Sequence, residues 1–98
     1  PEAAREQEIV RARVPDVSDA LLKQLVDFVQ GLRELDIRKR PSISETVDWA
    51  RTLLLMHATE LDEDMVRSTL NVLLKHESDI QAVDKDVRTL ARAVSANG

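Results

Sequence analysis

The chain has 98 residues and a formal net charge of −4; 43% of its residues are hydrophobic and 33% are charged. This composition is that of one globular domain rather than a disordered or fibrous chain. The sequence has no Cys, which excludes a disulfide framework and a cysteine-ligated zinc site, and its negative charge disfavours non-specific binding to nucleic acid. Two Gly and three Pro argue against a turn-rich all-β fold, so we predict an all-α protein.

Membrane insertion and secretion are not expected from the pattern of apolar residues. The longest apolar run, residues 53–56, is far shorter than the ~20 residues that cross a bilayer. The first residues are charged and lack the apolar centre of a signal peptide. We therefore expect no membrane association and a cytoplasmic location.

Hydrophobic residues at spacings of three and four predict about five amphipathic helices. The predicted helices cover approximately residues 2–14, 18–35, 42–58, 62–74 and 78–94. Helices this short are marginal alone, so they are expected to pack into one compact bundle. We predict a single domain over residues 1–98, ordered to about residue 95.

Local signals set the predicted helix boundaries. Pro15 ends the first helix, because the residue before a proline is driven out of helical geometry. Ser18 and Asp62 are predicted N-caps, since their side chains can accept hydrogen bonds from free amides. Ser42 and Glu45 match a capping box.

Three further features concern packing. In the third predicted helix, 42–58, apolar residues cover more than one face, which predicts that it is the central and most buried helix. Trp49 in this helix is best interpreted as a core residue, although an exposed Trp would indicate a partner surface. Gly31, inside the second helix, either permits close packing of another helix or is a tolerated defect.

The sequence contains no recognisable catalytic or metal-binding motif. It has neither a Gly-rich phosphate loop nor a His-Glu-x-x-His helix. His57 and His76 lie near the ends of different predicted helices, and a metal site would have to recruit their acidic neighbours. We interpret each histidine as a polar residue at a helix C-terminus and expect no metal site and no catalytic residue.

One basic segment is distinctive in an otherwise acidic chain. Arg38, Lys39 and Arg40 lead directly into the helix predicted to start at Ser42. A helix N-terminus offers free amides and a positive dipole, which suit an anion such as phosphate. Arginine would add a planar two-pronged donor and lysine a point charge. The segment is therefore a candidate phosphate site; the alternative is a solvated basic loop.

The chain also contains three segments that resemble a known family: PEAAREQEIVRARVP (1–15), LDIRKRPSISETVDWAR (35–51) and LNVLLKH (70–76). The first resembles the stretch that follows the nucleotide-binding core in MoxR-type AAA+ ATPases. The second resembles the lid-domain segment in one branch of that family, and the third is similar to its downstream helix. The resemblance covers roughly residues 1–80 and implies a C-terminal helical lid domain.

The resemblance implies a nucleotide-sensing role. In such ATPases the lid closes over the nucleotide and often supplies a "sensor 2" arginine, near the start of the helix that corresponds to the one beginning at Ser42. In this sequence Ser44 or Glu45 stands where many relatives carry the arginine. Arg38 or Arg40 is then the candidate substitute, in agreement with the anion argument above.

The family also implies a ligand and partners. Ile9 and Ile43 would form an apolar wall against the adenine. The full-length protein would bind ATP with magnesium, whereas no cofactor is expected on this chain, which lacks a P-loop and is not an enzyme by itself. Members resemble chaperone-type remodelling or maturation factors, which assemble as rings and often work with von Willebrand factor A domain proteins. The lid's immediate partners would be the AAA+ core domain and neighbouring ring subunits.

Two other functions compete with the lid interpretation. A free-standing helical module could bind a partner helix through a groove or through the face carrying Trp49. A helix-turn-helix protein could contact DNA phosphates with the basic segment, but the third helix presents Glu45 and Asp48 rather than outward Arg, Asn or Gln. We therefore expect no nucleic-acid partner.

Overall fold

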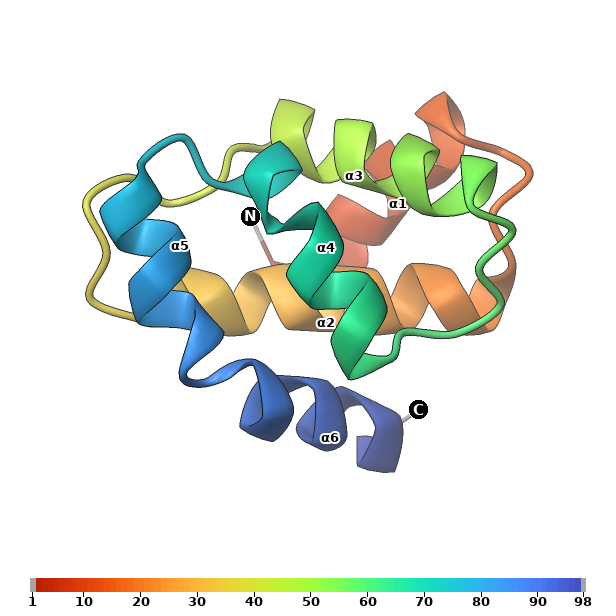
Figure 1. The fold of residues 1–98 in the computed structure, drawn as a ribbon. Helices are drawn as coiled ribbons and strands as arrows, with labels where there is room; N and C mark the ends of the chain where they lie inside the picture. The colour runs from red at the N-terminus through yellow and green to blue at the C-terminus, as the bar shows by residue number, and fades with distance from the viewer. Residues whose placement is uncertain (1, 98) are drawn as a thin grey trace.

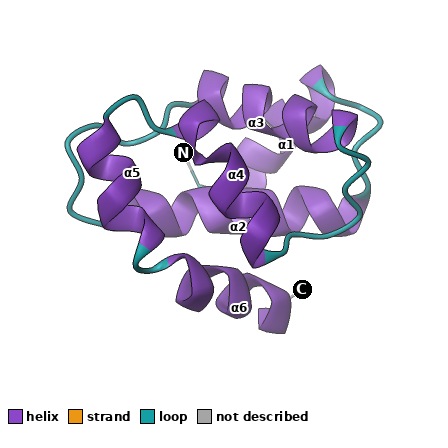
Figure 2. Ribbon diagram, viewed as in Figure 1, coloured by secondary structure: helices purple, strands orange, loops and turns teal. Residues whose placement is uncertain are grey.

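The computed structural model describes the backbone of residues 2–97 and the side chains of residues 2–94. It consists of six helices: α1 (Ala3–Arg13), α2 (Asp19–Arg33), α3 (Ile43–Leu55), α4 (Glu63–Leu73), α5 (Glu77–Asp84) and α6 (Val87–Asn97). Loops join the helices, and the described residues form no strand, as Figures 1 and 2 show. The all-α prediction is confirmed. None of the described helices is long and apolar enough to cross a membrane.

The predicted N-caps are confirmed by their hydrogen bonds. The Ser18 hydroxyl accepts from the Leu21 amide at 3.2 Å, and an Asp62 carboxylate oxygen accepts from the Met65 amide at 2.8 Å. Ser42 starts α3 as one half of a complete capping box. Each cap satisfies an amide that would otherwise lack a partner in the first helical turn. These three helix starts are therefore encoded locally.

The prediction that the third helix is the most buried is wrong, because that position belongs to α2. Eight of the 15 residues of α2 are buried, against six of 13 in α3. Helices α1, α3 and α6 all pack on α2, which lies along the length of the molecule in Figure 1. The apolar residues at the end of α3 that suggested wider burial instead reach the surface, where Leu55 is 81% exposed.

The predicted fifth helix is divided into α5 and α6. The chain turns at Lys85 and Asp86, where the Asp86 amide donates to the Val83 carbonyl at 2.8 Å and the Asp86 carbonyl accepts from Leu90 at 2.9 Å. Asp favours helix starts over helix interiors, which explains a new helix directly after it. Helix α6 extends to Asn97, and Gly98 lies outside the described residues. Order to about residue 95 stays a prediction.

The two histidines differ. His57 follows the end of α3, as predicted, and has a positive φ of 58°. The amide of His57 donates to the Leu54 carbonyl at 3.0 Å and the Ala58 amide donates to the Leu53 carbonyl at 3.1 Å, the pattern of a Schellman motif. His76 was predicted at a helix C-terminus but is the N-cap residue of α5, without a side-chain cap.

The core confirms the interpretation of Trp49. Its side chain is fully buried, its ring lies 5.4 Å from that of Phe28, and its indole N–H donates to the Thr69 hydroxyl at 2.8 Å. Gly31 allows close packing of α6 on α2, because an added Cβ would lie only 3.1 Å from the Leu90 side chain. The second interpretation of Gly31, a tolerated defect, is therefore unnecessary.

Candidate functional site

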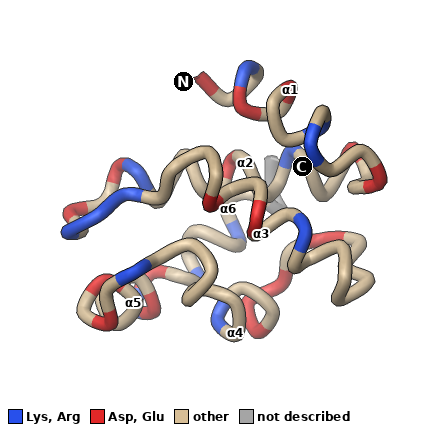
Figure 3. Tube along the Cα trace, turned by 90° about the horizontal axis from the view of Figure 1, so that it is seen from above, with Lys and Arg blue, Asp and Glu red and all other residues tan. Residues whose placement is uncertain are grey.

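The basic segment forms the end of the loop that leads from α2 to α3. We call residues 38–40 the basic loop. In Figure 3 it is the continuous blue stretch in that connection. Its three cationic residues are exposed, whereas the following Pro41 is buried. The loop thus has a fixed end at Pro41 and side chains available to solvent.

The start of α3 is already occupied by a carboxylate of the chain. An oxygen of Glu45 accepts from the Ser42 amide at 2.8 Å, while the Ser42 hydroxyl accepts from the Glu45 amide at 3.2 Å. Glu45 also forms ion pairs with Lys39 at 3.2 Å and with Lys75 at 3.3 Å. Burial by itself would raise the pKa of Glu45, but its hydrogen bonds with Ser42, Lys39 and Lys75 hold the pKa below its ordinary value. An external anion therefore does not find an empty helix tip here.

A second carboxylate binds the backbone of the basic loop. The oxygens of Asp79, from the first turn of α5, accept from the Arg38 amide at 2.8 Å and the Lys39 amide at 3.1 Å. The Asp79 residue is 3% exposed. The hydrogen bond from the Arg38 amide lowers the pKa of Asp79, and that from Lys39 adds to the effect, against a burial contribution that would raise it. The loop amides therefore form an anion site that an aspartate fills.

The three cations of the basic loop do not converge. Lys39 is directed to Glu45, and the Arg40 Nε donates to the Arg33 carbonyl at 2.6 Å. Within the described part of the chain, the Arg38 guanidinium forms no hydrogen bond or ion pair, although its backbone amide is bound to Asp79. Ser44 is exposed in the first turn of α3. Arg38 is thus the loop residue whose charged group is best available to a ligand.

The loop is anchored by a buried network that the sequence argument missed. Glu6 of α1 is fully buried, and its two oxygens accept from the Arg33 guanidinium at 2.6 and 2.8 Å. Gln30 and the Thr46 hydroxyl also donate to Glu6, at 2.7 and 2.8 Å. Arg33 reaches further and donates from Nε to the Pro41 carbonyl at 2.9 Å. One carboxylate therefore joins α1, α2 and α3, and its main partner fixes the end of the basic loop.

Electrostatics at Glu6 favour the charged form. Burial alone would raise the pKa of Glu6, but hydrogen bonds from Arg33, Thr46 and Gln30, together with the positive charge of Arg33, hold it below its ordinary value. Such a pair is costly to break, because removing one partner leaves an uncompensated buried charge.

The two residues expected to contact adenine lie on neighbouring helices. Ile9 is on α1 and Ile43 begins α3, and these two helices pack against each other. Both side chains are half-buried, and Ile43 packs against the hydrophobic core. Part of the Ile43 surface is therefore already used by the fold.

Only local signals pointed toward this site. The capping-box pattern includes Glu45, so the sequence could have predicted that its carboxylate binds the amide at the start of α3. Asp79 binds backbone amides some 40 positions earlier in the chain, and Glu6 lies 27 positions before Arg33. No spacing rule predicts such contacts.

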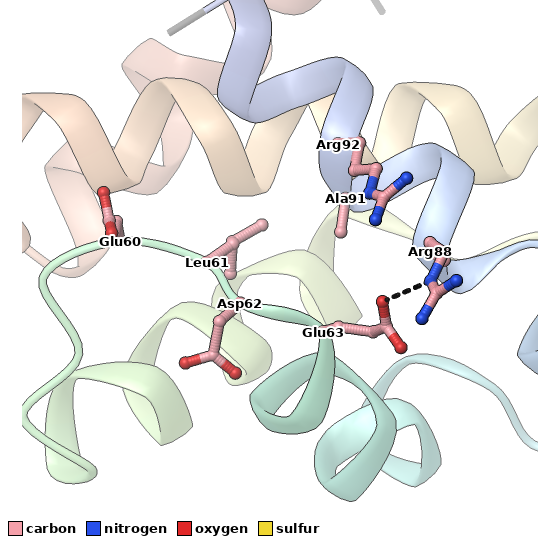
Figure 4. Close-up of a pocket in the computed structure, with 7 residues that line it drawn as sticks. All are labelled: Glu60, Leu61, Asp62, Glu63, Arg88, Ala91 and Arg92. Atoms are coloured by element: carbon pink, nitrogen blue, oxygen red, sulfur yellow. Dashed lines mark hydrogen bonds and ion pairs between the residues drawn. The ribbon is translucent and has the colours of Figure 1, made fainter.

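A separate cavity of about 320 Å³ lies between α6 and the segment that leads into α4 (Figure 4). Its apolar lining comes from Leu61 and Ala91, and Arg88 forms an ion pair with Glu63 across it at 3.3 Å. No group of three His, Cys, Asp or Glu side chains suited to a metal ion is present among the described residues, in this cavity or elsewhere. The basic loop remains the region with the clearest binding chemistry.

Comparisons with protein family models, with curated proteins and with solved structures found no match to this chain. The observations that bear on function are therefore the basic loop, the carboxylates around it, and the resemblance of residues 1–80 to the lid region of MoxR-type AAA+ ATPases.

Proposed function

We propose that this chain is the nucleotide-sensing, ring-coupling lid of a MoxR-type AAA+ ATPase with chaperone-like remodelling or maturation activity. The observation that carries the proposal is the exposed basic loop directly before α3. In the lid domains that the sequence resembles, the helix corresponding to α3 often carries the phosphate-sensing arginine near its start. In this assignment ATP and magnesium are held by the core domain, and the lid supplies positive charge to the phosphates. The chain has no P-loop and does not hydrolyse ATP alone.

The charged side chains, rather than the helix tip, would contact the phosphates. The start of α3 is closed by Glu45, and the Lys39 ammonium is shared with that carboxylate. Arg38 has an exposed guanidinium, and among the described residues Arg40 donates only from its Nε. A guanidinium with two free N–H groups can hold a phosphate in a bidentate manner. We assign the sensor role to Arg38, with Arg40 as its neighbour.

Motion of the lid as a unit would carry the nucleotide state to the ring. The Glu6 network ties α1 and α3 to α2, and Arg33 ties the same network to the Pro41 end of the basic loop. A force on the loop is thus applied to three helices together. Rigid-body rotation of this kind is a common means of coupling neighbouring subunits.

The reading frame gives the first test. A P-loop upstream of residue 1 in the same frame is expected, and a frame without one would reject the proposal.

In the full-length protein, Arg38→Ala should weaken ATP binding or lower turnover by roughly tenfold, as expected for the loss of one charge-assisted phosphate contact. Arg51→Ala is the matched control, because Arg51 is exposed on α3 and its side chain forms, within the described part of the chain, only a 3.6 Å ion pair with Asp48. Equal activity in both variants would contradict the sensor assignment.

A specific observation supports a second candidate, a helical protein–protein interaction module. Leu55 and Met56 at the end of α3 are adjacent, large and apolar, and they are 81% and 44% exposed. The version of this idea that used Trp49 is wrong, because that side chain is fully buried. An independent short reading frame, with partner binding abolished by Leu55→Ser, would favour this module over the lid.

A further inference from the structure

Helix α5 is attached to the basic loop by a carboxylate that binds two successive backbone amides. The Asp79 oxygens lie 2.8 Å from the Arg38 nitrogen and 3.1 Å from the Lys39 nitrogen. Successive amides that point to one position form an anion-binding concavity. In Figure 1, α5 lies beside the loop between α2 and α3. Asp79 therefore occupies the place that an external anion would take on this loop.

Two further kinds of contact hold α5. Arg67 of α4 donates from Nε to an Asp84 carboxylate oxygen at 2.9 Å, and Ile80 packs against the hydrophobic core. The helix has eight residues, and its buried residues are Asp79 and Val83. Its principal helix neighbour is α4, and its N-cap residue, His76, provides no side-chain cap. Elements with little buried surface open most easily. The two hydrogen bonds of Asp79 therefore attach α5 to the basic loop, whereas Arg67 and the apolar contacts attach it to the rest of the bundle.

We propose that Asp79 is an internal competitor for phosphate, and that a polyphosphate bound to the basic loop displaces Asp79 and releases α5. This inference rests on the proposed function, since it takes the loop as a phosphate site, and it adds the regulation of that site. Because Asp79 is 3% exposed, a phosphate oxygen cannot reach the two amides while α5 is docked. Binding and docking therefore exclude each other, and each must weaken the other equally.

Replacement of the Asp79 carboxylate by an external anion favours a highly charged ligand. Asp79 bridges the backbone amides of Arg38 and Lys39, and the positive charge of the Arg38 guanidinium also acts on its carboxylate. A polyphosphate could keep the amide hydrogen bonds and add a bidentate contact with the Arg38 guanidinium, which Asp79 leaves unused. The Asp79 carboxylate carries a single charge, and its advantage in binding the loop amides is the high local concentration that results from its attachment to the same chain.

The first experiment titrates the wild-type chain with inorganic pyrophosphate and follows the backbone amides by NMR. The amides of Arg38 and Lys39 should shift, and hydrogen-exchange protection in α5 should fall while that in α2 is retained. ATP should produce the same pattern through its triphosphate, and adenosine should not. Saturation with pyrophosphate without loss of protection in α5 would overturn the proposal.

The second experiment removes the competitor. Asp79→Asn should bind pyrophosphate at least ~5-fold more tightly than wild type, at the lower end of typical coupling between sites. Glu77→Gln is the matched control, because it removes one negative charge from an exposed side chain in the same turn of α5 and leaves Asp79 on the amides. Equal affinities of the two variants, or no binding by any of the three proteins, would overturn the proposal. The wild-type exchange measurement remains decisive if Asp79→Asn unfolds.

The two proposals can fail separately. If Arg38→Ala has no effect on the full-length ATPase but pyrophosphate still displaces α5, the lid assignment is wrong and the exchange is right. If Arg38→Ala impairs turnover while α5 stays protected, the lid assignment stands and the exchange is wrong.

Discussion

Two of the buried carboxylates among the described residues, Glu6 and Asp79, join distant segments through partners of different kinds. Glu6 is held by side chains, chiefly the two-pronged Arg33 guanidinium. Asp79 is held by two backbone amides of a loop whose cationic side chains remain exposed. The first arrangement pairs opposite charges inside the bundle, and the second fills an anion site at its edge. We infer that Glu6 is a permanent structural tie and Asp79 an exchangeable one.

The largest expected effect comes from breaking the Glu6 tie. Arg33→Met leaves the Glu6 carboxylate buried without its charge partner, which should lower the free energy of unfolding by about 3–5 kcal/mol. Urea unfolding measures this loss. The control Arg51→Met changes an exposed residue of α3 and should alter stability by less than about 0.5 kcal/mol. Similar midpoints for the two variants would show that Glu6 is not a structural tie.

The double variant Glu6→Met with Arg33→Met sharpens the same point. Because it removes both charges and refills the volume with apolar atoms, it should be more stable than Arg33→Met alone, by about 1 kcal/mol or more. The comparison uses urea unfolding of both proteins under one set of conditions. A double variant less stable than the single one would mean that the other partners of Glu6, Gln30 and Thr46, dominate its energy.

Acid should act on both ties. Glu6, Glu45 and Asp79 all have pKa values below their ordinary ones, so each binds a proton more readily in the unfolded chain. Their contribution to stability is therefore fully present above the ordinary carboxyl pKa of about 4 and is lost as the pH falls through the lowered values. Unfolding free energies measured from pH 7 down to pH 2 should be flat at first and then decrease. Glu6→Gln should show a smaller decrease, and an unchanged acid slope would contradict the pairing.

The smallest effect on the whole protein is expected at the second tie. Without ligand, Asp79→Asn should remove hydrogen-exchange protection from α5 and leave the global unfolding midpoint close to that of wild type, because α5 buries only Asp79 and Val83. Native-state exchange of individual amides distinguishes the local from the global effect. Equal loss of protection in α2 would mean that the two ties are alike.

What the sequence could predict follows from the range of each interaction. The caps at Ser18, Ser42 and Asp62 involve amides three positions away, so a local pattern identifies them. The basic loop was evident as three consecutive cations. By contrast, the partners of Glu6 and Asp79 lie 24 to 41 positions away, and only the folded chain brings them together.

The spacing of apolar residues failed to predict the boundary between α5 and α6, because the helical spacing continues across the turn that separates them. The apolar spacing from Val83 to Val87 is helical, and both side chains are buried, but the backbone turns between them at Lys85 and Asp86. The same hydrophobic stripe therefore fits one long helix or two short ones. Asp86 favours the start of a helix, so the sequence does carry a local signal for the second helix.

The left-handed backbone at His57 has a consequence for redesign of the chain. A non-glycine residue in this conformation costs about 1 kcal/mol or more, and the hydrogen bonds that close the Schellman motif come from main-chain atoms. The imidazole is therefore dispensable to the turn, and glycine at this position would reinforce it. Since the turn lies at the opposite end of α3 from Ser42, such a protein would tolerate more damaging substitutions around the basic loop, which makes it a useful background in which to dissect them.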